Sequence, residues 1–184
     1  MLLAVQASLI TARRVTWHRR LGWAGAALAT VMVGVGILGS LVAAHRPTGF
    51  IDVPVDPLRF LVVPLADLAL FAVFVTMAVA KRRDGQAHKR YMLLASIVLL
   101  EAAVGRWPVA FMKGSSPLPF VDMPSLMTDL FLVPLCAWDI TSRRRLHPAT
   151  LWGALAIVAS HALQMPLAST AAWQVFAGWA VQCA

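Results

Sequence analysis

The long apolar segments of this 184-residue chain contain four charged residues well inside their ends, Asp67, Glu101, Arg106 and Asp129, and a further one, Asp139, near the end of the segment that holds Asp129. Such a residue in a membrane-spanning helix usually faces the protein interior or a wet cavity, and it often marks the path of an ion or a proton. Glu101 and Arg106 are five residues apart, which is about 140° around a helix. We therefore expect their partners on other helices.

This polar cluster has two interpretations. In the first, Arg106 pairs with Asp67 or Asp129 and holds neighbouring helices together. In the second, three carboxylates against one arginine leave up to two negative charges, which need protons or a bound cation. The second interpretation predicts a path for a small cation or a proton. Pro64 and Pro134 favour it, because a proline frees a backbone carbonyl that can line a cavity.

His161 lies near the middle of another apolar segment, beside Ser160 and one turn before Gln164. It is a candidate axial ligand of haem b or a member of a proton relay, although a hydrogen-bonded packing role is the commoner one for such a residue. The chain has no second histidine at the same expected depth for bis-histidine ligation of a haem.

A second set of residues recurs where a helix is expected to begin, with paired basic residues next to a histidine. Helix N-termini combined with Arg and Lys can hold a lipid phosphate or a phosphorylated metabolite, or the histidines can be ordinary interfacial residues at headgroup level. So many cations disfavour a metal site there. The candidate contacts to anionic lipid or phosphate are His18, Arg19, Arg20, His88, Lys89, Arg90, Arg144 and His147.

The composition indicates that these residues are positioned by membrane helices. Apolar residues make up 60% of the chain and charged residues only 13%, which is far from the balance of a soluble domain. The fold class is therefore all-α, a polytopic transmembrane bundle of about six helices in a single domain, built as three similar hairpins. The expected spans are 21–44, 60–80, 91–111, 124–141 and 151–167. Residues 1–11 are expected to form a partial span that is the remainder of a longer helix, and 171–184 an interfacial or truncated helix.

Basic residues set the expected orientation. Most of the 16 Lys and Arg lie in the first, third and fifth connections, so these connections are predicted to face the cytoplasm of a bacterial inner membrane. A net charge of +8 then indicates anionic lipids as partners, and nucleic acid is not expected. Small residues recur at every fourth position of the segment 21–44, at Gly22, Ala26, Thr30 and Gly34, and such a stripe allows helices to approach closely. The sequence does not decide whether the protein forms a homo-oligomer.

No sequence pattern for catalysis is present. The chain has no glycine-rich nucleotide loop, zinc-ligand spacing or nucleophile elbow, so we assign no catalytic residue and no metal ligand. An enzymatic activity is the less favoured interpretation, although the absence of these motifs does not exclude one. Three functions stay open: transport of a small cation or a proton, lipid binding or scaffolding, and haem-dependent redox chemistry.

Three strings carry a resemblance. ARRVTWHRRLGWAG at 12–25, AHKRYMLLA at 87–95 and RRRLHPATLWG at 143–153 are similar to a family of bacterial multi-spanning inner-membrane proteins that has no established activity. The resemblance implies location and fold, with no mechanism, cofactor or site. Members of that family carry more residues before the segment equivalent to Met1, in agreement with a shortened first helix.

Overall fold

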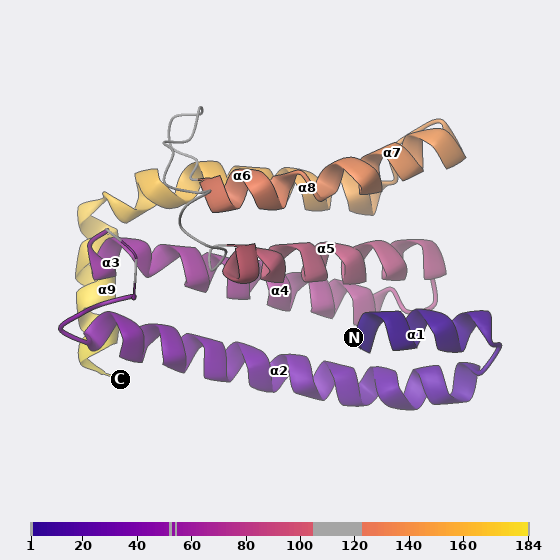
Figure 1. Ribbon diagram of the computed structural model, residues 1–184, viewed down its shortest axis with the longest axis horizontal. Helices are drawn as coiled ribbons and strands as arrows, with labels where there is room; N and C mark the ends of the chain where they lie inside the picture. Colours follow the sequence, from indigo (N-terminus) through magenta and orange to yellow (C-terminus); the bar gives the residue numbers. More distant parts are fainter. Residues whose placement is uncertain (1, 52, 54, 105–122, 184) are drawn as a thin grey trace.

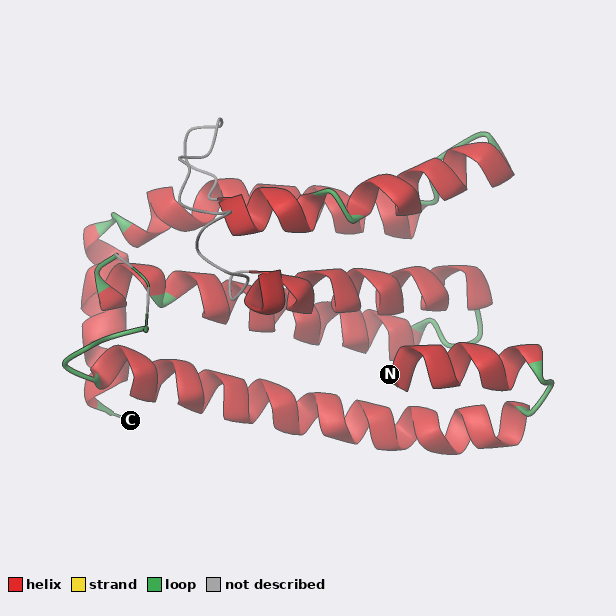
Figure 2. Cartoon of the chain, in the orientation of Figure 1, coloured by secondary structure: helices red, strands yellow, loops and turns green. Residues whose placement is uncertain are grey.

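The chain is helical throughout the part that the structure describes. A computed structural model describes residues 2–51, 53, 55–104 and 123–183, and no strand occurs in these ranges (Figure 2). The helices are α1 (Leu2–Thr11), α2 (Val15–His45), α3 (Pro57–Phe60), α4 (Val62–Ala80), α5 (Gly85–Val104), α6 (Met123–Asp129), α7 (Leu132–Arg143), α8 (Pro148–Ala168) and α9 (Ala171–Gln182).

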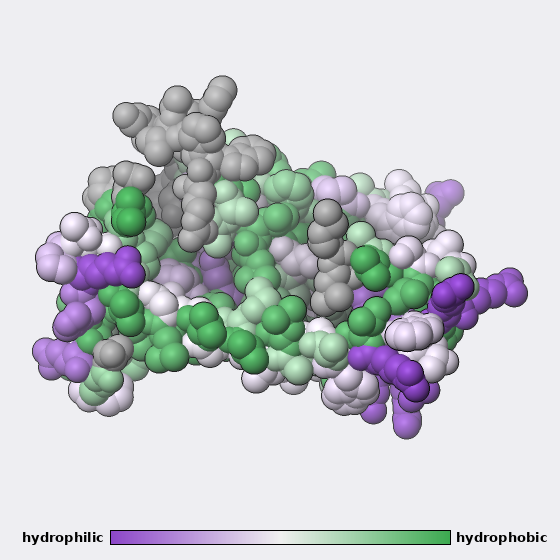
Figure 3. Space-filling model, turned by 60° about the horizontal axis from the view of Figure 1, so that its bottom comes forward, coloured by the Kyte–Doolittle hydropathy of each residue, from purple (hydrophilic) through white to green (hydrophobic). Residues whose placement is uncertain are grey.

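Four helical segments among the described residues are long and apolar enough to cross a membrane. They are Val15–His45, Pro57–Ala80, Met123–Arg143 and Pro148–Ala168. The outer face of α2 exposes large side chains, such as Val35 at 64%, as expected when lipid is the solvent. Figure 3 shows an apolar band between polar groups at the two ends of the molecule. The length, composition and surface of these helices indicate a membrane protein.

Helices α4 and α5 form the centre of the bundle. They pack against each other, and α8 packs against both, while α2 lies against α4 (Figure 1). The main core joins residues from α2, α4, α5, α7 and α8. Its buried members are Ala29, Phe71, Phe74, Leu94, Ala95, Ile97, Val98, Leu132, Leu135 and Ile157.

The three arginine-rich connections lie at one end of the bundle. Figure 1 shows the α1–α2, α4–α5 and α7–α8 turns together at the right of the view. At the opposite end, α9 runs across the bundle instead of along it. Trp173 of α9 links this helix to α3, because its indole Nε1 donates a hydrogen bond to the Leu58 carbonyl at 2.8 Å. We call the two ends the basic end and the α9 end.

Prolines account for two interruptions of the long helices. Pro64 and Pro134 have no N–H to bond the carbonyls of Phe60 and Leu130 four residues earlier. The chain accordingly breaks between α3 and α4 at Leu61, and between α6 and α7 at residues 130–131. The first break lies at the α9 end of α4, and the second directly follows Asp129.

Two helices begin six residues before their expected spans. Helix α2 begins at Val15, six residues before the predicted span, because nothing between Val15 and Leu21 breaks a helix. Helix α5 begins at Gly85 and is described as far as Val104. The end of the predicted span 91–111 lies outside the described residues.

The α4–α5 turn at the basic end is closed by an aspartate cap. Asp84 Oδ1 accepts hydrogen bonds from the backbone N–H groups of Gln86 at 2.9 Å and Ala87 at 3.2 Å. The Ala87 and Gln86 N–H groups lower the pKa of Asp84 below its ordinary value, so it caps α5 as an anion.

Candidate functional site: a buried carboxylate–histidine cluster

His161 of α8 lies between two carboxylates from other helices. Its Nε2 is 2.8 Å from Oε2 of Glu101 on α5, and its Nδ1 is 3.0 Å from Oδ1 of Asp129 at the end of α6. The side chains of His161 and Glu101 are 1% and 4% exposed, and that of Asp129 is 22% exposed. These separations are those of ion pairs, yet none of the four atoms makes a well-directed hydrogen bond.

Asp67 of α4 completes the site, which we call the carboxylate–histidine cluster: Asp67, Glu101, Asp129 and His161. One ligand atom from each of Asp67, Glu101 and His161 lies within 4.8 Å of the others, and all three residues are buried. Four helices therefore contribute one ionisable side chain each to one point in the bundle.

Neutral polar residues orient two of the carboxylates. Ser125 Oγ donates a hydrogen bond to Glu101 Oε1 at 2.9 Å, which leaves Oε2 as the oxygen facing His161. Gln164 Nε2 donates to Asp67 Oδ1 at 3.5 Å. Gln164 follows His161 by three residues, so both lie on the same face of α8.

Close packing of α8 on α5 positions His161 opposite Glu101. Gly153 lies against Leu94 of α5 so closely that a Cβ at this position would collide with the leucine side chain. Leu94 is fully buried, so its side chain could change position only by displacing its neighbours in the core. A larger residue at 153 would push α8 away from α5, and with it His161, which lies about two turns further along the helix.

The structure brings together more than the sequence predicted. Asp67, Glu101 and Asp129 were expected to form a cluster, and they lie together. Arg106, the fourth expected member, lies outside the described residues. His161 was treated as a separate candidate, whereas here it is the centre of the group. With Glu101 and Asp129 within 3.0 Å of its two nitrogens, a haem iron would have to displace a carboxylate to bind it.

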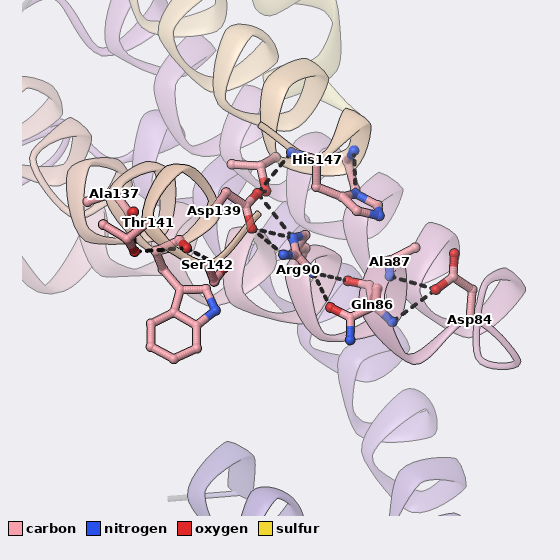
Figure 4. Close-up of polar contacts among 12 residues, drawn as sticks. Asp84, Gln86, Ala87, Arg90, Ala137, Asp139, Thr141, Ser142 and His147 are labelled. Carbon is pink, nitrogen blue, oxygen red and sulfur yellow. Dashed lines mark hydrogen bonds and ion pairs between the residues drawn. The ribbon is translucent and has the colours of Figure 1, made fainter. Parts of the chain in front are cut away.

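A second polar group lies at the basic end, where Asp139 of α7 accepts hydrogen bonds from four donor groups (Figure 4). The donors are Arg90 through Nε at 3.0 Å and also through a terminal guanidinium nitrogen, Thr150 Oγ1 at 2.6 Å and the His147 backbone N–H at 3.0 Å. Arg90 also donates to the carbonyl of Gln86 at 2.8 Å. Arg90 and Asp139 are 1% and 0% exposed.

This pairing differs from the expectation for Arg90. The sequence predicted that Arg90 contacts lipid headgroups. Its guanidinium is instead buried and paired with the carboxylate of Asp139, because α5 and α7 each place one charged residue at the same depth. Sequence reasoning placed Asp139 within a span and gave it no partner. The pair could have been predicted from one feature of the sequence, because Arg90 and Asp139 both lie about one turn inside the basic ends of their helices.

His147 caps the start of α8. Partial burial lowers its pKa, and Arg90 and Arg143 lower it further. The neutral ring can therefore accept a hydrogen bond, and its Nδ1 does so from the Ala149 N–H at 3.1 Å. This role as a cap makes His147 a weaker partner for an anion than a charged imidazole would be.

The other residues predicted to contact lipid lie at the same end of the bundle. His18 of α2 and His88 of α5 approach edge to face, with ring centroids 6.3 Å apart, and His88 Nδ1 lies 2.8 Å from the Ala78 carbonyl oxygen. Both histidines are partly buried. Four of the basic residues are exposed and free to meet headgroups: Arg19, Arg20, Lys89 and Arg144.

Comparisons with protein-family models, with curated proteins and with solved structures found no match to this chain.

Proposed function

We propose that the chain is a bacterial inner-membrane protein that moves a small cation or a proton through the carboxylate–histidine cluster. The observation that carries this proposal is the packing of Asp67, Glu101 and Asp129 around His161 inside the bundle. Buried charges in helices that lipid surrounds are costly unless they are paired or bind an ion.

A count of charges favours a site for a cation. The three carboxylates face at most one positive charge on His161, and Arg106 adds one more if it joins them. At least one negative charge then needs a cation or a proton. With the basic end in the cytoplasm, as the distribution of Lys and Arg predicts, the cluster lies in the outer half of the membrane.

Ion flux in vesicles tests this function. We expect purified full-length protein to raise the rate of H⁺, Na⁺ or K⁺ entry above that of empty vesicles. The double variant Asp67→Asn/Asp129→Asn should lower this rate at least about 10-fold, because two of the three carboxylates lose their charge. Asp56→Asn is the matched control, since Asp56 is exposed and asparagine still caps α3. Wild-type flux in the double variant would exclude the function.

Lipid binding is the second candidate, and a groove favours it. A cavity of about 540 Å³ separates α5 from α7, with an apolar wall that includes Leu93, Ile97 and Phe131, and with Lys89 at its basic end. An acyl chain could occupy the wall while Lys89 meets the phosphate.

Lipid retention after purification tests this alternative. The protein should keep phosphatidylglycerol in preference to phosphatidylcholine, as read by native mass spectrometry. Combining Lys89→Ala with Arg19→Ala and Arg144→Ala should abolish the preference, because each basic residue near the surface contributes about 1 kcal/mol. An unchanged preference would exclude this role for the basic residues.

A further inference from the structure

We propose that the carboxylate–histidine cluster is a binding site for one divalent first-row transition cation, such as Zn²⁺, Mn²⁺ or Fe²⁺. The ligands are His161 Nε2, Glu101 Oε2 and one carboxylate oxygen of Asp67. This inference rests on the proposed function and names the class of cation that the cluster takes.

The ligand atoms are already close to the separations that a metal imposes. Ligands about 2.1 Å from a common ion lie roughly 3.3 Å apart at a tetrahedral edge and roughly 4.2 Å apart when opposite. Glu101 Oε2 is 2.8 Å from His161 Nε2, and the three ligand atoms lie within 4.8 Å of one another. To bind an ion, Glu101 Oε2 and His161 Nε2 would have to separate by about half an ångström, and the Asp67 carboxylate would close the remaining side.

The atoms that would bind the ion lack well-directed hydrogen bonds. Both ring nitrogens of His161 and Oε2 of Glu101 are buried and make none, although His161 is 2% exposed and Glu101 4%. Buried polar atoms are normally satisfied. His161 Nε2 and Glu101 Oε2 are within 2.8 Å of each other but form no directed hydrogen bond, so both lone pairs can turn toward an ion placed between them and Asp67.

The surrounding residues match the outer shell of a metal site. A histidine ligand usually donates its second ring N–H to a carboxylate, which fixes the orientation of the ring. Asp129 lies 3.0 Å from His161 Nδ1 and fits that role. Ser125 holds Oε1 of Glu101, and Gln164 reaches Asp67. Each proposed ligand therefore has an outer partner.

The donor set selects the class of metal. One imidazole and two carboxylates suit zinc, manganese or iron, whereas Mg²⁺ and Ca²⁺ prefer oxygen ligands alone. Soft thiolate sites are excluded here, because Cys183 is exposed and Cys136 lies on α7, away from the cluster residues. Two carboxylates and a neutral imidazole also balance the charge of a divalent ion.

Cobalt binding to detergent-purified full-length protein without a histidine tag tests the site. We expect one Co²⁺ per chain, visible-range cobalt absorption bands, displacement by an equivalent of Zn²⁺, and a higher melting temperature with metal. His161→Gln and Glu101→Gln should remove stoichiometric binding. Asp129→Asn should weaken it roughly 10- to 100-fold, as outer-shell changes do. His45→Gln and Asp56→Asn, both at exposed positions, should bind as the wild type does.

The outcomes separate this inference from the proposed function. Wild-type protein that binds no Co²⁺ or Zn²⁺ overturns the metal site, even if vesicles show a proton or sodium flux that depends on the cluster. Binding that survives both His161→Gln and Glu101→Gln also overturns it. Stoichiometric binding that needs these residues, without any ion flux, supports the site and removes transport. The wild-type measurement decides even if a variant does not fold.

Discussion

Asp139→Asn is expected to lower the free energy of unfolding by about 3 to 5 kcal/mol, the usual cost of breaking a buried ion pair by removing one partner. The change keeps the shape of the side chain but leaves the Arg90 guanidinium, 1% exposed, without a counter-ion. It also weakens the bonds from Thr150 and the His147 N–H. Unfolding by SDS in mixed micelles, followed by tryptophan fluorescence, measures the loss.

Two further variants show whether charge is the cause. Replacing both partners, as Arg90→Met/Asp139→Leu, should recover most of the loss, because an apolar pair of similar volume leaves no buried charge. Lys89→Ala, next to Arg90 but exposed, should stay within about 0.5 kcal/mol of the wild type. A loss below 1 kcal/mol for Asp139→Asn would show that the pair does not hold α5 to α7 and α8.

His161→Leu is expected to cost a similar amount, about 3 to 5 kcal/mol, at the other end of the bundle. Leucine fills much of the same volume, so the loss comes from the carboxylate of Glu101, which stays buried with no partner at Oε2. The same unfolding measurement applies, in metal-free buffer.

A second substitution, Glu101→Gln, tests whether the unpaired carboxylate causes this loss. In the His161→Leu background it should restore much of the lost stability, because an amide carries no charge that needs a counter-ion. His45→Leu, at an exposed position on α2, is the matched control and should change little. If Glu101→Gln instead lowers the stability of His161→Leu further, then the two residues do not act as a pair.

Much of the fold could be predicted from the sequence. The apolar runs around Thr30, Phe71 and Ile157 are long enough to be helices, and α2, α4 and α8 cover them. The basic connections repeat at every second turn, and these turns lie at one end of the bundle. The breaks at Leu61 and before Leu132 could have been placed too, because each precedes a proline by three or four residues.

The membership of the site was harder to predict, because it depends on the relative heights of helices. Asp67, Glu101, Asp129 and His161 each lie roughly 13 to 16 residues from the basic end of their segment, or about 20 to 24 Å along a helix. Equal depth was therefore available as a signal for including His161. The sequence gives no such signal for which faces of the helices turn toward each other, because packing at positions such as Gly153 and Leu94 sets the rotation of each helix about its axis.

Arg90 and Asp139 illustrate the same limit. A basic residue near a helix end is most often solvated or in contact with headgroups, and Lys89 follows that rule. Its neighbour Arg90 does not, because the next position on the helix turns inward toward α7. The sequence alone does not distinguish these two positions, since both follow His88 in one basic run.

Cation entry into vesicles that hold either the wild type or Glu101→Gln tests the central claim most directly. Glu101 contacts both His161 and Ser125, and glutamine keeps its size while removing its charge. With Mn²⁺, Na⁺ and H⁺ offered separately, we expect wild-type vesicles to take up at least one of them faster than empty vesicles do. The variant should lose at least about 90% of that rate at a temperature at which it remains folded. Equal rates for wild-type and empty vesicles with all three ions, or full activity in Glu101→Gln, would contradict a cation path through this cluster.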